Sequence, residues 1–112
     1  MKIAVPCVDG KLCMHFGHCD RFALVEVDAA SKTIAEETET TPPPHAPGVL
    51  PQWLAEQGVT VVIAGGMGRR AQSLFEEHGI KVVVGAPADT PRRLAEAWLA
   101  GNLETGDNVC DH

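Results

Sequence analysis

An almost continuous apolar run, Val59 to Ala64, lies between Gly58 and Gly65 in the second half of the chain. A short run of this kind, rich in β-branched residues, is typical of a strand that is covered on both faces inside a parallel sheet. A second such run, Ile80 to Val84, follows after a segment of helix length. Because a sheet covered on both faces needs helices on each side, the two runs restrict the chain to an α/β fold.

The remaining segments complete this pattern. Branched residues alternate around polar turns near the N-terminus, which predicts three antiparallel strands. Their ranges are Lys2 to Pro6, Phe22 to Val27 and Thr33 to Glu39. Helical spacing followed by a glycine stop predicts three helices. Their ranges are Val49 to Gln57, Gly68 or Arg69 to His78, and Thr90 to Ala100. Four prolines between Thr40 and Gly48 predict a loop.

Right-handed crossovers order these strands as 3-2-1-4-5 in one mixed five-stranded sheet with helices packed on it. This three-layer arrangement is a ribonuclease H-like motif. The carboxyl ends of the first strand and of the two parallel strands then share one edge of the sheet, which we call the top edge. Ligands of open α/β sheets bind at such an edge. We expect one domain over residues 1–101 and a polar tail over residues 102–112.

Composition excludes several classes of function. The 112 residues suffice for one domain with a single core. The net charge of -6 and the pI of about 5.2 argue against binding to nucleic acid or to an anionic membrane surface. No apolar run has the length of a signal peptide or a membrane span, so we expect a cytoplasmic protein. In a reducing cytosol, the four cysteines are expected to be thiols or metal ligands.

The loop after the first predicted strand is dense in metal ligands. Cys13, His15, His18 and Cys19 follow one another in the spacing Cys-x-His-x2-His-Cys. Thiolate and imidazole favour zinc, copper(I) and iron-sulfur or related clusters over magnesium and calcium. The spacing does not fit structural zinc sites, which use paired Cys-x2-Cys units. The sequence therefore predicts that these four residues bind a metal or a metal cluster, although His18 can equally be a surface histidine.

Other candidate ligands also have a second interpretation. Cys7 follows a buried strand and can equally be a small core residue. His45 is expected near the top edge and can equally be a surface histidine. We leave His78 out, because a histidine near a helix C-terminus is stabilised there by the helix dipole. Cys110 and His112 end the chain as Cys-x-His, which either covers the site or belongs to an untethered tail.

An anionic ligand is indicated at the same edge. All five arginines are predicted there: Arg21, Arg69, Arg70, Arg92 and Arg93. Four of them begin helices, where a cation opposes the macrodipole, so helix propensity does not explain them. The backbone amides of Gly65, Gly66, Met67 and Gly68 add neutral donors, as at other anion sites formed by helix N-termini. We predict that this glycine turn binds the anion together with Arg69 and Arg70, although any single arginine can be an ordinary solvated side chain.

The common catalytic motifs are absent from the sequence. The chain has neither a Gly-x-Ser-x-Gly nucleophile elbow nor a Walker sequence. The glycine turn alone is too short to be a nucleotide fingerprint. The sequence therefore supports a binding protein that is not an enzyme.

Several segments together carry a family resemblance: Met1 to Pro6, His15-Phe16-Gly17 followed by Phe22, Val61 to Ala71, and Gly79 to Val82. In these segments, and nearly throughout the chain up to about Gly101, the sequence resembles the dinitrogenase iron-molybdenum cofactor-binding domain family. That family includes nitrogenase accessory proteins that carry the iron-molybdenum cofactor or its precursor, and an orange protein that holds a molybdenum-copper sulfide cluster. The resemblance implies a ribonuclease H-like fold and a cluster contact through His15. Many stand-alone members lack cysteines in the first loop, so Cys13 and Cys19 indicate a subgroup and leave the cargo open.

The function that the resemblance implies is a non-catalytic carrier or scaffold. Its ligand would be an anionic metal-sulfur cluster: the iron-molybdenum cofactor, its precursor, or a related molybdenum, iron or copper sulfide, which connects the chain to nitrogen fixation. Its partner would be a cofactor-assembly enzyme or a recipient metalloprotein, and a homodimer is one way to enclose the cluster. Two alternatives stay open. One is a regulatory or protein-interaction domain without metal, and the other is an enzyme that acts on a phosphorylated metabolite at the glycine turn.

Overall fold

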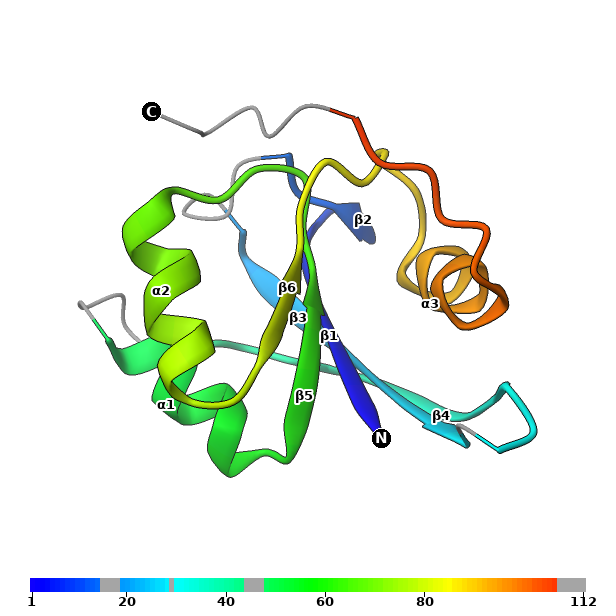
Figure 1. Ribbon diagram of the computed structural model, residues 1–112, viewed down its shortest axis with the longest axis horizontal. Helices are drawn as coiled ribbons and strands as arrows, with labels where there is room; N and C mark the ends of the chain where they lie inside the picture. The colour runs from blue at the N-terminus through cyan, green and yellow to red at the C-terminus, as the bar shows by residue number, and fades with distance from the viewer. Residues whose placement is uncertain (15–18, 29, 44–47, 107–112) are drawn as a thin grey trace.

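Four strands come first, and helices then alternate with two further strands, along the part of the chain that the computed structural model describes, which is residues 1–14, 19–28, 30–43 and 48–106 (Figure 1). The strands are β1 (Lys2–Val8), β2 (Lys11–Leu12), β3 (Arg21–Asp28), β4 (Thr33–Thr40), β5 (Val59–Ile63) and β6 (Lys81–Val83). The helices are α1 (Val49–Glu56), α2 (Arg69–Glu77) and α3 (Pro91–Ala100). Each predicted element is confirmed to within two residues at either end. Only β2 was not predicted.

The strands form one sheet in the order β4-β3-β1-β5-β6, with β2 paired to β1 beside this path. β1 is parallel to β5, and β5 is parallel to β6, whereas the β1–β3 and β3–β4 pairs are antiparallel. This is the predicted order 3-2-1-4-5, so the ribonuclease H-like arrangement is confirmed. The additional strand β2 follows a two-residue turn, Asp9-Gly10, in which both residues have positive φ (53° and 80°). Such an Asp-Gly turn is a favoured connection of a tight β-hairpin.

Helices cover both faces of the sheet, which gives the predicted three layers (Figure 1). The side of α3 encloses one apolar cluster, to which β1 contributes Ile3, Val5 and Cys7. The opposite side, under α1 and α2, encloses a second cluster that contains Ala4, Phe22 and Phe75. Successive side chains of a strand point to opposite faces, so β1 supplies both clusters. We call these two sides the α3 face and the α1–α2 face.

The described helices have between 8 and 10 residues. None of them is long and apolar enough to cross a lipid bilayer. The helices cover the sheet. Of the three, α2 and α3 follow the parallel strands β5 and β6, so their first turns lie near the top edge.

The chain does not leave the domain where α3 ends. Gly101 adopts a left-handed conformation (φ 76°), and the amide of Asn102 donates to the carbonyl of Ala97 at 2.8 Å. This is the bonding of a Schellman helix terminus, which turns the chain back. Leu103 then packs, partly buried, against the cluster of the α3 face. Residues 102–106, which we call the strap, rise from the end of α3 to the top edge (Figure 1).

Candidate functional site

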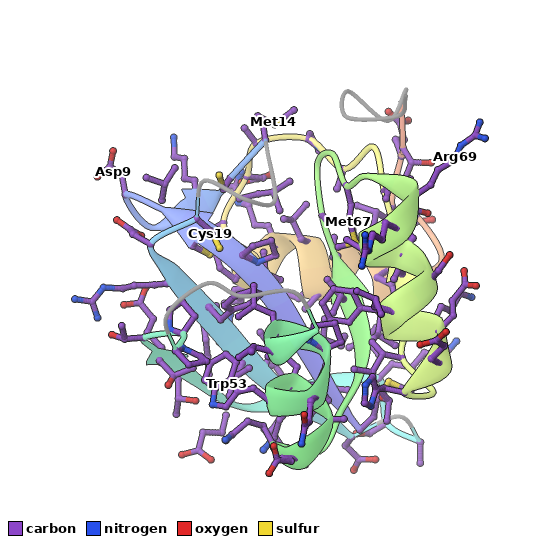
Figure 2. The ribbon with its side chains drawn as sticks, turned by 90° about the vertical axis from the view of Figure 1, so that its left-hand side faces the viewer. Asp9, Met14, Cys19, Trp53, Met67 and Arg69 are labelled. Carbon is purple, nitrogen blue, oxygen red and sulfur yellow. The ribbon has the colours of Figure 1, made fainter. Side chains whose placement is uncertain are left out.

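The end of β1 positions two of the predicted ligands. The amide of Cys13 donates to the carbonyl of Pro6 at 2.9 Å, and the amide of Asp20 donates to the carbonyl of Cys7 at 3.0 Å. Consecutive carbonyls of a strand point to opposite neighbours, so the segments that carry Cys13 and Cys19 lie on the two sides of the end of β1. Figure 2 shows Cys19 in this upper part of the molecule, below Met14.

Both of these cysteines are shielded from solvent. Leu12 and its partner Cys7 belong to the cluster of the α3 face, and Cys13 lies directly after the end of β2. Cys19 packs against the cluster of the α1–α2 face. Cys13 is 4% exposed and Cys19 is partly buried, so the pair forms a sheltered dithiol at the top edge.

Cys7 is a core residue on the opposite face. It is 1% exposed, and its thiol donates to the carbonyl of Val5 at 3.3 Å. Burial is the main reason that the pKa of the Cys7 thiol is raised to about 12, and negative charge on Glu39 and Cys19 adds to the effect. Of the two interpretations of Cys7, the structure supports the small buried core residue.

Because the pKa of Cys7 is raised, we predict that this residue lowers the free energy of unfolding at alkaline pH. At pH 7 the variant Cys7→Ala is expected to be less stable than the natural protein by about 1 kcal/mol, because it loses buried volume. Above the ordinary thiol value of 9.0 the unfolded chain loses the Cys7 proton, while the folded protein keeps it up to about pH 12. The natural protein therefore loses stability by up to about 1.4 kcal/mol per pH unit through this residue, and the variant does not. Urea unfolding at pH 7, 9 and 10.5 should show the difference in stability narrowing and then changing sign, and a constant difference would contradict the assignment.

Cys19 is also protonated at neutral pH in the metal-free protein. Burial is the largest cause that raises the pKa of Cys19 to about 11, and the charge of Cys13 is the next. The second cause shows that the two thiols are close enough to influence each other. Thiolate is the form that binds metal, so loading this site must release protons and become tighter as the pH rises.

The glycine turn after β5 lies directly against the first loop. A Cβ on Gly65 would stand 3.0 Å from Cα of Met14, 3.1 Å from its carbonyl oxygen and 3.2 Å from its Sδ. Gly65, Gly66 and Met67 are all buried. A side chain at Gly65 would have to displace Met14 by a few tenths of an ångström, and its absence lets the turn lie next to the residue that follows Cys13.

Within the predicted anion site, Met67 can contribute only backbone groups. Its side chain is fully buried in the cluster of the α1–α2 face. Its carbonyl accepts a hydrogen bond from Nε2 of Gln72 at 2.8 Å, which fixes the turn to α2. The prediction that Met67 belongs to the site therefore concerns its amide, and the side chain serves packing.

The first turn of α2 has the features of an anion-binding helix terminus. Its N-cap is Gly68, which provides no side-chain hydrogen bond to the helix, and the first turn contains no acidic residue. Arg69 and Arg70 are exposed at its start, and Figure 2 shows Arg69 extending outward beside the top edge. Backbone amides without a side-chain cap favour a negatively charged ligand, and the two guanidinium groups beside them favour it further.

The other predicted arginines have acidic neighbours. Nε of Arg92 lies 3.6 Å from Oε1 of Glu96, and Nη1 of Arg93 lies 4.0 Å from Oδ1 of Asp89. These pairs are exposed and stabilise the protein only weakly, but they explain the presence of the two arginines without a bound anion. The inference that all five arginines indicate an anion was therefore too broad.

Arg21 lies in a pocket of about 340 Å³ beside the end of β1. The pocket is lined by Cys7, Asp9, Gly10, Asp20, Arg21 and Glu39. Three carboxylates against one guanidinium repel an anion. An anionic ligand is therefore better accommodated on the other side, between the dithiol and α2.

Five residues that the sequence analysis discussed lie outside the described residues: His15, His18, His45, Cys110 and His112. Within the described ranges, no three Cys, His, Asp or Glu side chains are placed to hold one metal ion. Of the four predicted metal ligands, Cys13 and Cys19 are the two that the described residues include. His78 is exposed at the end of α2, in keeping with its exclusion from the site.

The sequence analysis missed three residues that shape this edge. Met14 packs on Gly65. Gly85 donates its amide to the carbonyl of Gly65 at 2.8 Å, and Gly106 of the strap donates its amide to the carbonyl of Gly85 at 2.7 Å. A glycine two residues after the end of β5 and of β6 was the available signal for the two turns. Nothing in the sequence pairs Gly106 with them, because that contact depends on the path of the strap.

Comparisons with known proteins found both similar sequences and similar folds. The family described as dinitrogenase iron-molybdenum cofactor matches residues 1–101. The uncharacterized protein MJ0580 of Methanocaldococcus jannaschii is 33% identical over 107 residues, which are 93% of this chain and 90% of that protein. The crystal structure of PH0822 has a TM-score of 0.84 and 27% identity, over 95% of this chain and 96% of its own. The apo form of the orange protein from Desulfovibrio gigas has a TM-score of 0.72 and 26% identity, over 96% and 93% of the two chains.

Proposed function

Because the chain belongs to the dinitrogenase iron-molybdenum cofactor family, we propose that it is a non-catalytic carrier or scaffold that binds an anionic metal-sulfur cluster. The cluster is the iron-molybdenum cofactor, its precursor, or a related molybdenum, iron or copper sulfide. In this role the chain serves the biosynthesis or delivery of a cofactor, in the setting of nitrogen fixation that the family name indicates.

One observation carries the proposal: Cys13 and Cys19 are both shielded from solvent, and the charge of Cys13 helps to raise the pKa of Cys19, whereas Cys7 is buried in the cluster of the α3 face. Two thiols that shelter beside each other provide soft ligands for iron, copper or molybdenum sulfides. We assign direct coordination to Cys13, His15 and Cys19, with His18 or His45 as an additional ligand. The cluster would occupy the space above the dithiol and the glycine turn.

The charge of the surroundings fits an anionic cargo. A metal-sulfur cluster carries negative charge on its sulfides, and binding it next to thiolates adds to that charge. The amides of the turn from Gly65 to Gly68 and the guanidinium groups of Arg69 and Arg70 are assigned to offset it. The acidic pocket around Arg21 would repel the same cluster, which favours the α2 side of the edge.

The likeness to the orange protein of Desulfovibrio gigas supports a related role, since that protein is 26% identical and has the same fold. A carrier also needs a protein that supplies or receives its cargo. We propose a cofactor-assembly enzyme or a recipient metalloprotein as the partner, which recognises the top edge. A homodimer that encloses the cluster between two such edges stays a prediction.

The proposal is tested by loading the protein under anaerobic conditions. Metal-free protein is incubated with iron(II), sulfide and tetrathiomolybdate, desalted, and analysed for metals, sulfide and visible absorption. We expect a new visible absorption that elutes with the protein, and a content of molybdenum or iron above that of a thiol-free control protein. In His15→Ala the binding is expected to weaken at least tenfold, which is about 1.4 kcal/mol.

Two results would contradict the proposal in different ways. If the protein isolated anaerobically contains no metal and takes none up, the site is not a cluster site, and the alternative of a protein-interaction domain without metal is favoured. If the cluster binds equally well to His15→Ala, the carrier function stands but the assignment of His15 as a ligand is wrong.

A further inference from the structure

The outer strand β4 is a long sheet edge to which only β3 is bonded among the described strands. It is the terminal strand of the sheet order. Its eight residues contain neither proline nor lysine, with which proteins commonly block an exposed edge. The one register shift against β3 lies between Glu26 and Val27, so the stretch from Glu36 to Thr40 pairs regularly. Every second residue of such an edge directs its N–H and C=O groups outward, where a further strand can bond to them.

The side chains of this edge are negatively charged. Glu36, Glu37 and Glu39 are all exposed. Of the lysines and arginines that the structure describes, none forms an ion pair with any of the three. Glu37 and Glu39 lie opposite Val25 and Ala23, two residues of the cluster of the α3 face. Since opposite residues of paired strands share a face of the sheet, these two carboxylates belong to the α3 side and stand two residues apart.

The pocket beside Arg21 continues this edge at its upper end. Glu39 lines the pocket together with Asp9, from the turn between β1 and β2, and Asp20, which precedes β3. The three carboxylates outweigh the one guanidinium, so the pocket favours a cation. Its volume of about 340 Å³ equals that of several water molecules at roughly 30 Å³ each, and can accept the end of a long side chain. Figure 2 shows Asp9 and Arg69 on opposite sides of the molecule, so this pocket lies away from the α2 side that we assign to the cluster.

A second copy of this chain does not suit the edge. Two β4 strands paired with each other would bring the three glutamates of each copy together along one seam, and like charges across a strand pair are destabilising. The chain also has no segment in which lysine or arginine recurs at every second position. Its adjacent arginines lie in the first turns of α2 and α3. The charge of the edge therefore favours a basic strand from another protein.

We propose that the outer edge of β4 and the acidic pocket bind an extended basic segment of a partner protein, which adds a strand to the sheet. The main chain of the segment bonds to β4, as in other cases of strand addition. Lysine or arginine at alternate positions lies opposite Glu37 and Glu39, and one further basic side chain enters the pocket. The inference goes beyond the proposed function, because this surface is separate from the cluster site and binds its partner with or without a cluster.

The test uses a fluorescein-labelled peptide in which lysine alternates with threonine. Its binding to the metal-free, full-length chain is measured by fluorescence anisotropy at low ionic strength, where charge pairs are least screened. We expect saturable binding and slower hydrogen exchange of the amides between Glu36 and Thr40. The same peptide, N-methylated at two successive central residues, keeps its charge but cannot bond through either edge. We expect it to bind at least about tenfold more weakly.

A matched pair of double variants tests the role of the glutamates. Glu37→Gln with Glu39→Gln removes the two charges that face the segment, and we expect peptide binding to weaken at least about tenfold. Glu76→Gln with Glu77→Gln removes two exposed glutamates of α2 and changes the net charge equally. Its binding should stay within about twofold of the natural protein. Circular dichroism should find both variants folded, because all of these side chains are exposed.

Three outcomes would overturn the inference. Equal losses in the two double variants would mean that the peptide responds only to the overall charge. Equal binding of the N-methylated peptide would rule out strand addition. A dimer in sedimentation, with the amides of β4 protected in the absence of peptide, would make a second copy the occupant.

The proposed function is tested separately, by loading. Loss of peptide binding in a protein that still takes up the cluster refutes this inference alone. A protein that binds the peptide at β4 but takes up no cluster refutes the proposed function and supports this inference.

Discussion

A variant with serine at both Cys13 and Cys19 is expected to lose cluster binding by at least about 100-fold, which corresponds to about 2.8 kcal/mol. The reason is chemical. A serine hydroxyl does not ionise near neutral pH, and it is a hard ligand that competes poorly for sulfide-bound iron, copper or molybdenum. The two cysteines are the sheltered pair at the top edge, and without them the described residues keep only the thiol of Cys7, which is buried in the cluster of the α3 face. Visible absorption and metal content after anaerobic loading measure the loss.

The matched control is Cys7→Ala, which removes a nearby thiol of β1 that is buried in the cluster of the α3 face. Its cluster binding is expected to stay within about twofold of the natural protein at pH 7. Equal losses in the Cys7 variant and in the double variant would mean that the effect comes from general destabilisation. Full binding in the double variant would remove the dithiol from the site.

Valine at Gly65 is expected to reduce the free energy of unfolding by about 1–3 kcal/mol, the usual cost of overpacking. Its Cβ would stand within about 3 Å of backbone atoms of Met14, which cannot yield as the tip of a long side chain can. The first loop must move away, and this motion separates Cys13 from the glycine turn. We therefore expect weaker cluster loading in the same variant, together with a lower urea midpoint.

Gly68→Ala is the stability control for this variant. Gly68 has an ordinary φ of -64°, and no described atom lies within 4 Å of the position of its Cβ. Its urea midpoint should shift by no more than the few tenths of a kcal/mol that separate glycine from alanine at an N-cap position. Equal destabilisation of both variants would show that the turn, and not its contact with Met14, is sensitive to any side chain.

Most of the architecture could be predicted because it depends on local patterns. The apolar runs at β5 and β6 identified strands covered on both faces, and glycine stops marked the ends of the helices. Few topologies obey the right-handed crossover rule, so the strand order followed. The short strand β2 was not predicted, because a two-residue strand has no periodicity of its own. The available signal was the Asp9-Gly10 turn, which is typical of a β-hairpin.

The candidate site could be predicted only in part. From ligand chemistry the sequence predicted Cys13 and Cys19 as metal ligands, which stays a prediction, but it left Cys7 open, since a thiol at the end of a strand can face either side. Register decided that question by pairing Cys7 with Leu12 inside the α3 face. The arginines were overinterpreted for a similar reason, because the partners of Arg92 and Arg93 are one helical turn away and are recognised only when the helix forms.

By itself, the sequence determined the layers, the strand order and which residues have the chemistry of candidate ligands, because each of these is encoded over a few neighbouring residues. Only the tertiary structure decided that Cys7 is buried on the α3 face and where the chain goes after α3. Both depend on contacts between residues far apart in sequence, such as Met14 with Gly65 and Gly106 with Gly85. Glycines permit these contacts because they lack a side chain. For the same reason, the sequence around a glycine gives no indication of which distant residue it will contact.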